Sequence, residues 1–419
     1  MTSIRSILPF LCFTSWFYLH AEITDWTRFR GPQGSGISTT ADLPLKWSEN
    51  NNLTWQVDLP GEGASSPIVW KDHIYLTAFT SSGNETEALK RHVLCLNRTD
   101  GREIWRRTVF ADLPEQENIR ENHGYATNSP AVDENRVYVF FGKSGVMALN
   151  HHGKELWRTR VGSRIHGWGS AASPVLHNGL VIINASVESE SLIALDGATG
   201  KKVWNTPGIK ESWNTPIIAE LDDGSHEIIL AMFRKVLGVD PASGKILWEC
   251  DTKINWYMCP GMLFHDGVVY AIGGRSGGGL AVKAGGRGDV TNTHLLWRLD
   301  KGTNVPTPIY HDEHLYFIHE NLAIAYCIDA KSGKTIYEER IQPSPGQIYP
   351  SPFLANGRIH YLSRRGECVV LPAEPRFEIL ARNILPKSAG VYNASPTLMG
   401  NQLLIRADKT LFCIGHHGE

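Results

Sequence analysis

The stretch that decides the fold is LDGATGKKVW, residues 195–204. It predicts a strand, a tight turn and a returning strand, because Asp196 can bond the backbone two residues on and Gly200 can adopt the positive φ of a hairpin loop. Trp204 then brings a large apolar face to the returning strand. The same pattern recurs as VDPASGKILW at 239–248 and IDAKSGKTIY at 328–337, with looser copies at 96–105 and 149–157. A hairpin repeated in this way indicates a repeat protein.

The repeat extends well beyond the hairpin. Each unit opens with Ser/Thr-Pro, or with Pro-Gly in one copy, and ends with the hairpin aromatic. The openings fall about every 45 residues, at Pro67, Pro130, Pro174, Pro216, Gly261, Pro308, Pro352 and Pro396. The closing aromatics are Trp55, Trp105, Trp157, Trp204, Trp248, Trp297, Tyr337 and Phe377. We therefore predict an all-β, eight-bladed β-propeller over residues 43–415.

The two ends of the repeat region complement each other. Residues 53–59 form a single strand without the three strands that should precede it, whereas residues 394–414 supply three strands without a fourth. We expect the N-terminal strand to complete the last blade, because this closure removes the open sheet edges of a linear array. The glycine-punctuated residues 22–42 are predicted to form an N-terminal clasp across the propeller, and residues 416–419 a tail.

The N-terminus has the pattern of a secretory signal peptide. Arg5 precedes an apolar run at 7–19 that is too short to span a bilayer, and cleavage after Ala21 defines residues 1–21 as the signal. A retained N-terminal anchor stays open as an alternative. We therefore expect a secreted or periplasmic mature chain, monomeric and without a transmembrane domain.

Charge and cysteine usage narrow the function further. The net charge is −2, which argues against a nucleic-acid-binding protein. Cys95, Cys327 and Cys413 take a position of the repeat where other copies carry a small residue, so they are expected to act as small hydrophobes. Cys250 and Cys259 are near each other in sequence, and a disulfide between them stays open.

The Asp-x-x-Thr/Ser-Gly-Lys-x-x-Trp hairpins resemble those of the pyrroloquinoline quinone (PQQ) repeat family. That family includes eight-bladed quinoprotein alcohol dehydrogenases and the assembly lipoprotein BamB. The opening WTRFRGPQGSG, residues 26–36, is similar to exported PQQ-like propellers of planctomycete and verrucomicrobial type. The resemblance makes PQQ with Ca²⁺ a possible cofactor pair. The dehydrogenases carry a disulfide between adjacent cysteines, however, and no two cysteines are adjacent in this sequence.

Long loops mark one face of the predicted propeller. The insertions at 81–91 and 109–128 fall on the face that carries the links between blades, where function usually resides. The inner loops of this face supply the cations Lys143, Arg234, Arg275, Arg364 and Lys409. The links supply the rings of His123, Tyr125, His166, Trp168, Trp213, Trp256, Tyr349 and Tyr392. A mouth ringed by cations with aromatic walls suits a planar or anionic ligand.

These patterns predict a binding or scaffold module for a small anionic ligand or an extracytoplasmic protein. A PQQ-dependent dehydrogenase of alcohols or sugars is one alternative, and a protein that binds or processes an acidic polysaccharide is another. No catalytic residue is assigned from the sequence, and the repeated Ser-Pro pairs are explained by turn chemistry. The sequence also lacks the paired histidine spacing of a metal site, and none is assigned.

Overall fold

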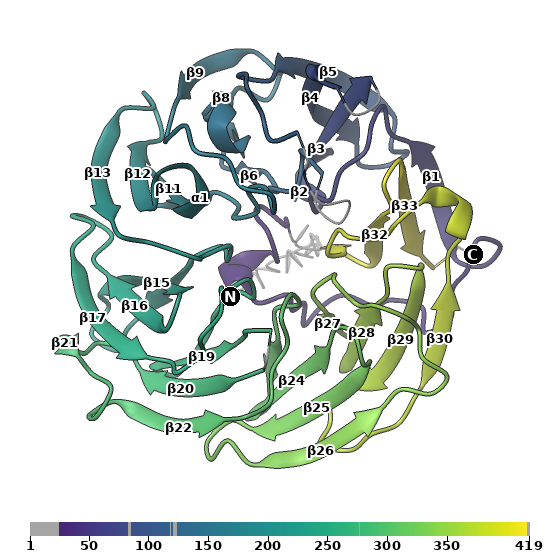
Figure 1. Ribbon diagram of the computed structural model, residues 1–419. Coiled ribbons are helices and arrows are strands. Elements are labelled where there is room, and N and C mark those ends of the chain that lie inside the picture. Colours follow the sequence, from purple (N-terminus) through teal and green to yellow (C-terminus); the bar gives the residue numbers. More distant parts are fainter. Residues whose placement is uncertain (1–24, 83–84, 118, 120–123, 276, 417–419) are drawn as a thin grey trace, which may run out of the picture.

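Eight antiparallel sheets surround a central axis like the blades of a propeller (Figure 1). The computed structural model describes residues 25–82, 85–117, 119, 124–275 and 277–416. Within these residues the chain is almost entirely β, with short helical turns at η1 (Pro32–Gly34), η2 (Gly142–Ser144), α1 (Ser186–Ser189) and η3 (Lys387–Ala389). The predicted eight-bladed propeller is confirmed. The predicted signal peptide, residues 1–21, lies outside the described residues.

Seven blades use strands that follow one another along the chain. The first four are β2–β5 (Ile68–Trp70, His73–Ser82, Glu85–Asn97, Glu103–Phe110), β6–β9 (Ala131–Val132, Val137–Phe140, Val146–Leu149, Glu155–Thr159), β10–β13 (Val175–His177, Leu180–Ala185, Ser191–Asp196, Lys202–Pro207) and β14–β17 (Ile217–Glu220, His226–Met232, Lys235–Val239, Ile246–Asp251). The next three are β18–β20 with β22 (Leu263–His265, Val268–Ile272, Gly279–Lys283, Leu295–Leu299), β23–β26 (Ile309–His311, His314–His319, Ile324–Asp329, Thr335–Arg340) and β27–β30 (Phe353–Ala355, Arg358–Leu362, Glu367–Pro372, Ala381–Ile384). A short strand, β21 (Gly288–Asp289), adds a parallel fifth member beside β17.

The eighth blade closes the ring as predicted. Its outer strand is β1 (Leu53–Asp58), which pairs antiparallel with β33 (Thr410–Gly415) beside β32 (Gln402–Arg406) and β31 (Thr397–Met399). Arg406 is fully buried, and its Nη1 donates to the carbonyl oxygens of Ser65 and Thr77 and to Ser65 Oγ, at 2.6 to 3.0 Å. The closing blade is thus tied to its neighbour by side-chain hydrogen bonds as well as by packing.

The hairpin tryptophans join each blade to the next. Trp157 Nε1 donates to Gly197 O at 3.0 Å, and Trp204 Nε1 donates to Pro241 O at 2.9 Å, both in the following blade's turn. A Cβ added at Gly200 would lie 2.5 Å from the Trp157 ring, so this turn needs glycine for contact as well as for its φ of 73°. The repeated Gly and Trp are therefore two halves of one interblade contact.

Trp248 breaks this pattern. Its Nε1 donates to Glu227 Oε2 of its own blade at 2.7 Å, and its ring is fully buried. The ring fills the space above Gly238, where a Cβ would lie 2.0 Å from Trp248 Nε1. In this blade the small-residue position therefore makes room for the tryptophan itself.

Gly238→Ala should lower the free energy of unfolding by about 2 to 4 kcal/mol, because the added methyl displaces a buried indole. Urea unfolding followed by circular dichroism measures the change. Ala194→Cys is the matched control, since Cys327 already occupies the equivalent position in another blade. A loss of stability in the control as large as that in Gly238→Ala would contradict this explanation.

The sequence prediction for the aromatic of the seventh blade was wrong. Phe377 lies before the first residue of β30. The position that carries Trp or Tyr in other blades is occupied here by Ala381, which lies opposite Val370. The Phe377 ring instead packs edge-on against Tyr337 of the preceding blade, with 5.9 Å between ring centroids. Phe377 thereby covers the face of the Tyr337 ring, whereas in other blades a turn glycine covers the ring of the preceding blade.

The small-residue position lies opposite the hairpin aromatic. Cys95 pairs with Trp105, Cys327 with Tyr337 and Cys413 with Trp55. These three cysteines are buried and free, as are Cys250 and Cys368, and Cys259 is free and partly buried. The possible Cys250–Cys259 disulfide is therefore not formed.

The Ser/Thr-Pro openings connect the blades around the axis. Ser129 Oγ accepts a hydrogen bond from Ser66 N, and Ser173 Oγ accepts one from Ser129 N. The same link is made by Thr215, Thr307, Ser351 and Ser395. Turn chemistry explains where these residues occur in the sequence, but their hydroxyls act between neighbouring blades.

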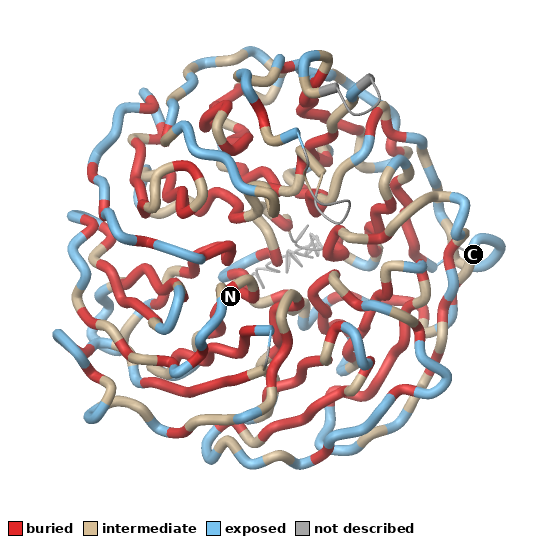
Figure 2. The backbone as a smooth tube through the Cα atoms, in the orientation of Figure 1, coloured by how far each residue is buried: buried red, intermediate tan, exposed pale blue. Residues whose placement is uncertain are grey.

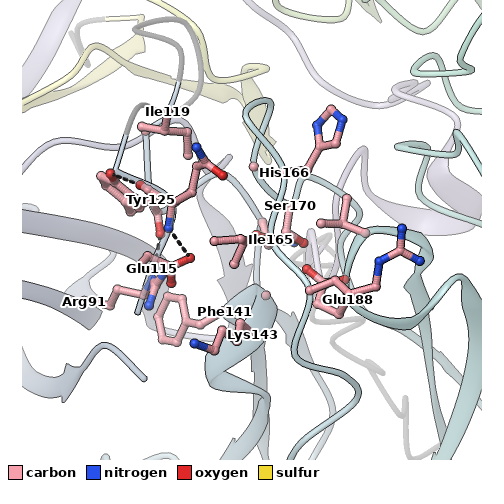
Figure 3. A pocket seen from close by; sticks show the side chains of 17 residues that line it. Arg91, Glu115, Ile119, Tyr125, Phe141, Lys143, Ile165, His166, Ser170 and Glu188 are labelled. Atoms are coloured by element: carbon pink, nitrogen blue, oxygen red, sulfur yellow. Dashed lines mark hydrogen bonds and ion pairs between the residues drawn. The ribbon is translucent and has the colours of Figure 1, made fainter. Parts of the chain in front are cut away.

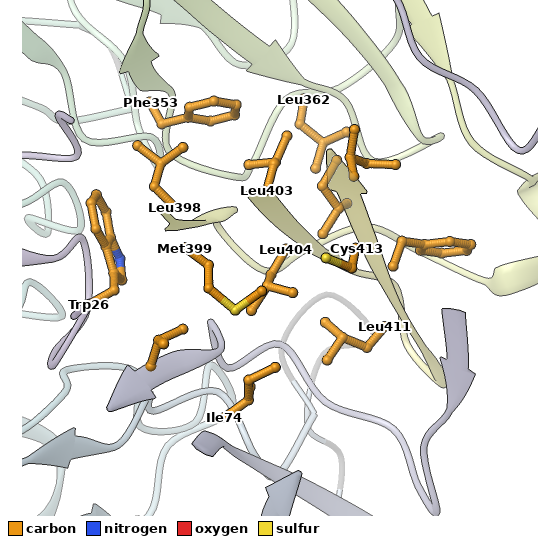
Figure 4. Close-up of a cluster of buried hydrophobic side chains, with 14 of the residues drawn as sticks. Trp26, Ile74, Phe353, Leu362, Leu398, Met399, Leu403, Leu404, Leu411 and Cys413 are labelled. Carbon is orange, nitrogen blue, oxygen red and sulfur yellow. The ribbon is translucent and has the colours of Figure 1, made fainter. Parts of the chain in front are cut away.

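Residues 25–41 cross the end of the axis opposite the insertions. Arg30 is 4% exposed and donates to the carbonyl oxygens of Gly34, Ser35, Pro308 and Pro352, at 2.7 to 3.1 Å. Arg28 Nη2 donates to Pro216 O at 3.0 Å. This segment thus binds carbonyl groups of the residues that open three blades, and Trp26 packs beside Leu398 and Met399 in a core shared with the closing blade (Figure 4).

Burial follows the radial plan (Figure 2). The inner strands are buried, whereas the outer strands and the loops of both faces carry most of the exposed residues. In the described part of the chain, the helices are too short or too polar to span a bilayer.

Candidate functional site

A cavity of about 140 Å³ lies on the axis where all eight links converge. Each link contributes at least one side chain, and Phe29 lines the same cavity. The lining comprises Phe29, Ala64, Thr127, Trp168, Ala171, Ser173, Trp213, Thr215, Tyr257, Cys259, Gly261, Asn304, Val305, Thr307, Tyr349, Ser351, Asn393 and Ser395. A cavity of this volume accommodates a single six-membered ring.

Aromatic rings form much of the cavity wall. Tyr257 packs against Trp168 and Trp213, with ring centroids 5.9 and 5.5 Å apart. Trp213 is held by its Nε1, which donates to Gly169 O at 2.9 Å. Asn304 Nδ2 donates to the Tyr257 hydroxyl at 3.0 Å, which fixes that ring too. The wall is therefore ordered before any ligand arrives.

No charged side chain is among the described residues that line this axial cavity. One cation lies at its edge. The Arg364 guanidinium sits 4.7 Å above the centroid of the Tyr349 ring, and its Nε donates to Asn393 Oδ1 at 2.9 Å. The site therefore combines an uncharged aromatic interior with a positive charge at the edge.

The two insertions meet beside this axial cavity. The described residues of 81–91 form strand rather than the expected loop, because β3 continues to Ser82 and β4 begins at Glu85, with Thr80 opposite Lys90. Arg91 of this hairpin pairs with Glu115 of the other insertion at 2.5 Å, and both side chains are buried. Arg91 Nε also donates to Tyr125 O at 3.0 Å. The ion pair fixes the second insertion on the first blade.

A second cavity, the insertion cleft, lies between this ion pair and α1 (Figure 3). Its charged lining residues are Arg91, Glu115, Lys143, Arg164 and Glu188. Glu188 is 2% exposed, and burial raises the pKa of its carboxyl to about 7.

The sequence analysis missed three residues of this cleft, Arg91, Glu115 and Glu188. Only the lengths of the two insertions pointed to Arg91 and Glu115.

The predicted site residues separate into three groups. Trp168, Trp213 and Tyr349 line the axial cavity, with Arg364 at its edge, whereas Lys143, Tyr125 and His166 line the insertion cleft. The remaining described residues line neither cavity: Arg234 pairs with Asp251, Lys409 pairs with Glu62, Arg275 stacks on Trp256, and Tyr392 is buried with its hydroxyl on Pro386 O. His123 lies outside the described residues. The expected ring of cations is therefore spread over separate contacts.

The axial cavity does not fit PQQ held by Ca²⁺. Calcium takes six to eight oxygen ligands, usually with carboxylates among them. The described lining offers hydroxyls and amides but no carboxylate. Glu320 lies behind Asn304, where its oxygens accept hydrogen bonds from Asn304 N and Asn321 Nδ2. No step of a quinone reaction is therefore derived for this site.

Comparison with known proteins places this architecture in a family. Residues 89–339 match the PQQ_2 family, described as outer membrane protein assembly factor BamB. The chain belongs to this PQQ_2 family. BamB from Burkholderia pseudomallei is 23% identical over 52% of this chain and 47% of its own length. A tetrathionate hydrolase from Acidithiobacillus ferrooxidans is 21% identical over 75% of this chain and 65% of its own length.

The fold of this chain is also similar to that of an enzyme of known structure. Quinohemoprotein alcohol dehydrogenase from Comamonas testosteroni superimposes with a TM-score of 0.68 at 12% identity, covering 94% of this chain and 81% of that one. The chain spans less than two thirds of the length of the two curated relatives that it matches. Since the names of these proteins describe an assembly factor, a hydrolase and a dehydrogenase, the shared fold leaves the activity open.

Proposed function

We propose that the protein is an extracytoplasmic binding module that takes a small ligand with one ring and one anionic group. The observation that carries this proposal is the axial cavity, where all eight links build one ring-sized space with aromatic walls. Trp168, Trp213 and Tyr257 offer ring faces, while serine, threonine and asparagine side chains offer hydrogen bonds. Cavities of this composition orient a ligand through a few polar groups.

The anionic group is assigned to the edge of the cavity. Arg364 is held in place by Asn393 and by Gln347 Oε1, which accepts from its Nη1 at 2.8 Å. A carboxylate on a ring in the cavity would reach a guanidinium that is already oriented, and such charge-assisted bonds are strong. The predicted secretory signal would direct the protein out of the cytoplasm.

Benzoate and D-glucuronate, each with one ring and one carboxylate, should bind at least about tenfold more tightly than D-glucose, because a charge-assisted bond adds more than 1 kcal/mol. Isothermal titration calorimetry with the purified protein measures the affinities. Arg364→Gln should abolish the preference for the acids.

Arg365→Gln is the matched control, since Arg365 is the exposed neighbour that lines neither cavity. The proposal fails if neither acid binds at millimolar concentration, or if Arg364→Gln leaves their affinities unchanged. PQQ with CaCl₂ belongs in the same series, because saturable binding followed by dye reduction with an alcohol would support a dehydrogenase instead.

A further inference from the structure

The insertion cleft contains a buried carboxyl oxygen without a hydrogen-bond partner. Glu188 Oε2 has none among the described residues, although the side chain is 2% exposed and lines the cleft. Figure 3 shows Glu188 beside Ser170 at the end of the cleft opposite the Arg91–Glu115 pair. Buried polar atoms nearly always have a partner. This atom therefore marks a place where a hydrogen-bond donor belongs.

None of the cations that line the cleft is paired with Glu188. Burial is the main cause that raises the pKa of Glu188; hydrogen bonds from its own backbone and from the Ser170 side chain lower it, and the nearby Glu115 carboxylate raises it. The other titratable groups of the cleft are Arg91, Tyr125, Lys143, Arg164 and His166. The three cations among them already have partners: Glu115, Pro114 O and Glu190. A cation entering the cleft would therefore find Glu188 without a cationic partner, whereas Glu115 is already paired with Arg91.

The size and lining of the cleft limit what that cation can be. Its volume of about 30 Å³ holds a group of the size of one water molecule. Phe141, Ile165 and Val187 give it apolar walls that suit a hydrocarbon stem. A calcium ion needs more oxygen ligands, and no cluster of three or more His, Cys, Asp and Glu side chains occurs in the part of the chain that the structure describes.

We propose that the insertion cleft binds a primary alkylammonium group, whose NH₃⁺ donates to Glu188 Oε2. This site is separate from the axial cavity and does not depend on the function proposed for it. A free amine and the lysine side chain of a partner offer the same chemistry.

Binding should release a proton. With its pKa near 7, Glu188 holds a proton in the free protein below neutral pH, and the ammonium group stabilises the ionised form. One proton per site should therefore leave when the amine binds at pH 6. The release should vanish at pH 8, where Glu188 is already ionised.

The experiment is calorimetric titration of the purified protein with n-butylammonium at pH 6 and pH 8, in buffers of different ionisation enthalpy. We expect saturable binding with proton release at pH 6 only. Glu188→Gln should weaken binding about 10- to 100-fold, as expected when a charged hydrogen bond is lost, and should abolish the release. Glu134→Gln is the matched control, because Glu134 is exposed in the turn between β6 and β7 and does not line the cleft.

Nα-acetyl-lysine methylamide identifies the source of the ammonium group. Tighter binding of this compound than of butylammonium would indicate a lysine of a protein partner, and equal binding would indicate a free amine. Three results would overturn the proposal: no butylammonium binding at millimolar concentration, which leaves water as the occupant; binding that Glu188→Gln does not weaken; or displacement of butylammonium by micromolar Ca²⁺. If Glu188→Gln fails to fold, proton release by the unaltered protein decides the question.

Discussion

Arg406→Met should lower the free energy of unfolding by about 2 to 4 kcal/mol, because it removes three buried hydrogen bonds and leaves Ser65 O without a donor where the ring closes. The guanidinium of Arg406 spans the closing blade and the first blade through Ser65 and Thr77. Methionine fills a similar length but donates no hydrogen bond. Urea unfolding monitored by tryptophan fluorescence measures the loss.

Lys409→Met provides the comparison on the same blade. Lys409 follows β32 closely, but its side chain is 62% exposed and makes a surface ion pair with Glu62 at 3.1 Å. Such pairs contribute about 0 to 1 kcal/mol, so this variant should unfold almost like the unaltered protein. A loss below about 1 kcal/mol for Arg406→Met would show that strand pairing alone holds the ring closed.

Arg30→Met should release the segment at 25–41 from the axis and lower the free energy of unfolding by about 2 to 4 kcal/mol. Four carbonyl oxygens lose their donor, and two of them belong to Pro308 and Pro352, which open the sixth and seventh blades. Hydrogen exchange measured by mass spectrometry should show faster exchange in this segment than in the blades.

Arg28→Met is the graded control for this prediction. Arg28 donates one hydrogen bond, to Pro216 O, so its loss should cost about 1 kcal/mol. Equal effects of the two substitutions, or unchanged exchange in Arg30→Met, would contradict the assignment of Arg30 as the residue that anchors this segment.

The blade count was predictable because its signals are local and repeated. Gly200 and Trp204 stand a few residues apart, and each copy of the hairpin repeats the same physical demand. The exceptions depend on contacts between distant residues. Trp248 follows the same pattern as Trp204, yet it turns toward Glu227 and Gly238, and nothing in the hairpin reveals that neighbourhood.

The candidate site was predictable only in part, for the same reason. The link positions of Trp168, Trp213 and Tyr349 follow from the repeat, and these residues do line one cavity. Loop position alone does not tell whether a cation faces the axis or a neighbouring carboxylate, as Lys409 and Glu62 illustrate. The burial of Glu188 arises from the packing of three segments and has no signature in the sequence.

Because the eighth blade is built from both ends of the propeller sequence, the ring can close only after the last strand has been synthesised. β1 is synthesised early but finds its partner strand β33 only at the far end of the propeller. Until that strand is available, β1 has an unpaired edge, and closing so long a loop is slow. A prematurely terminated chain would therefore keep this edge exposed and remain open to proteases. Only a chain that reaches β33 can become a sealed, protease-resistant ring.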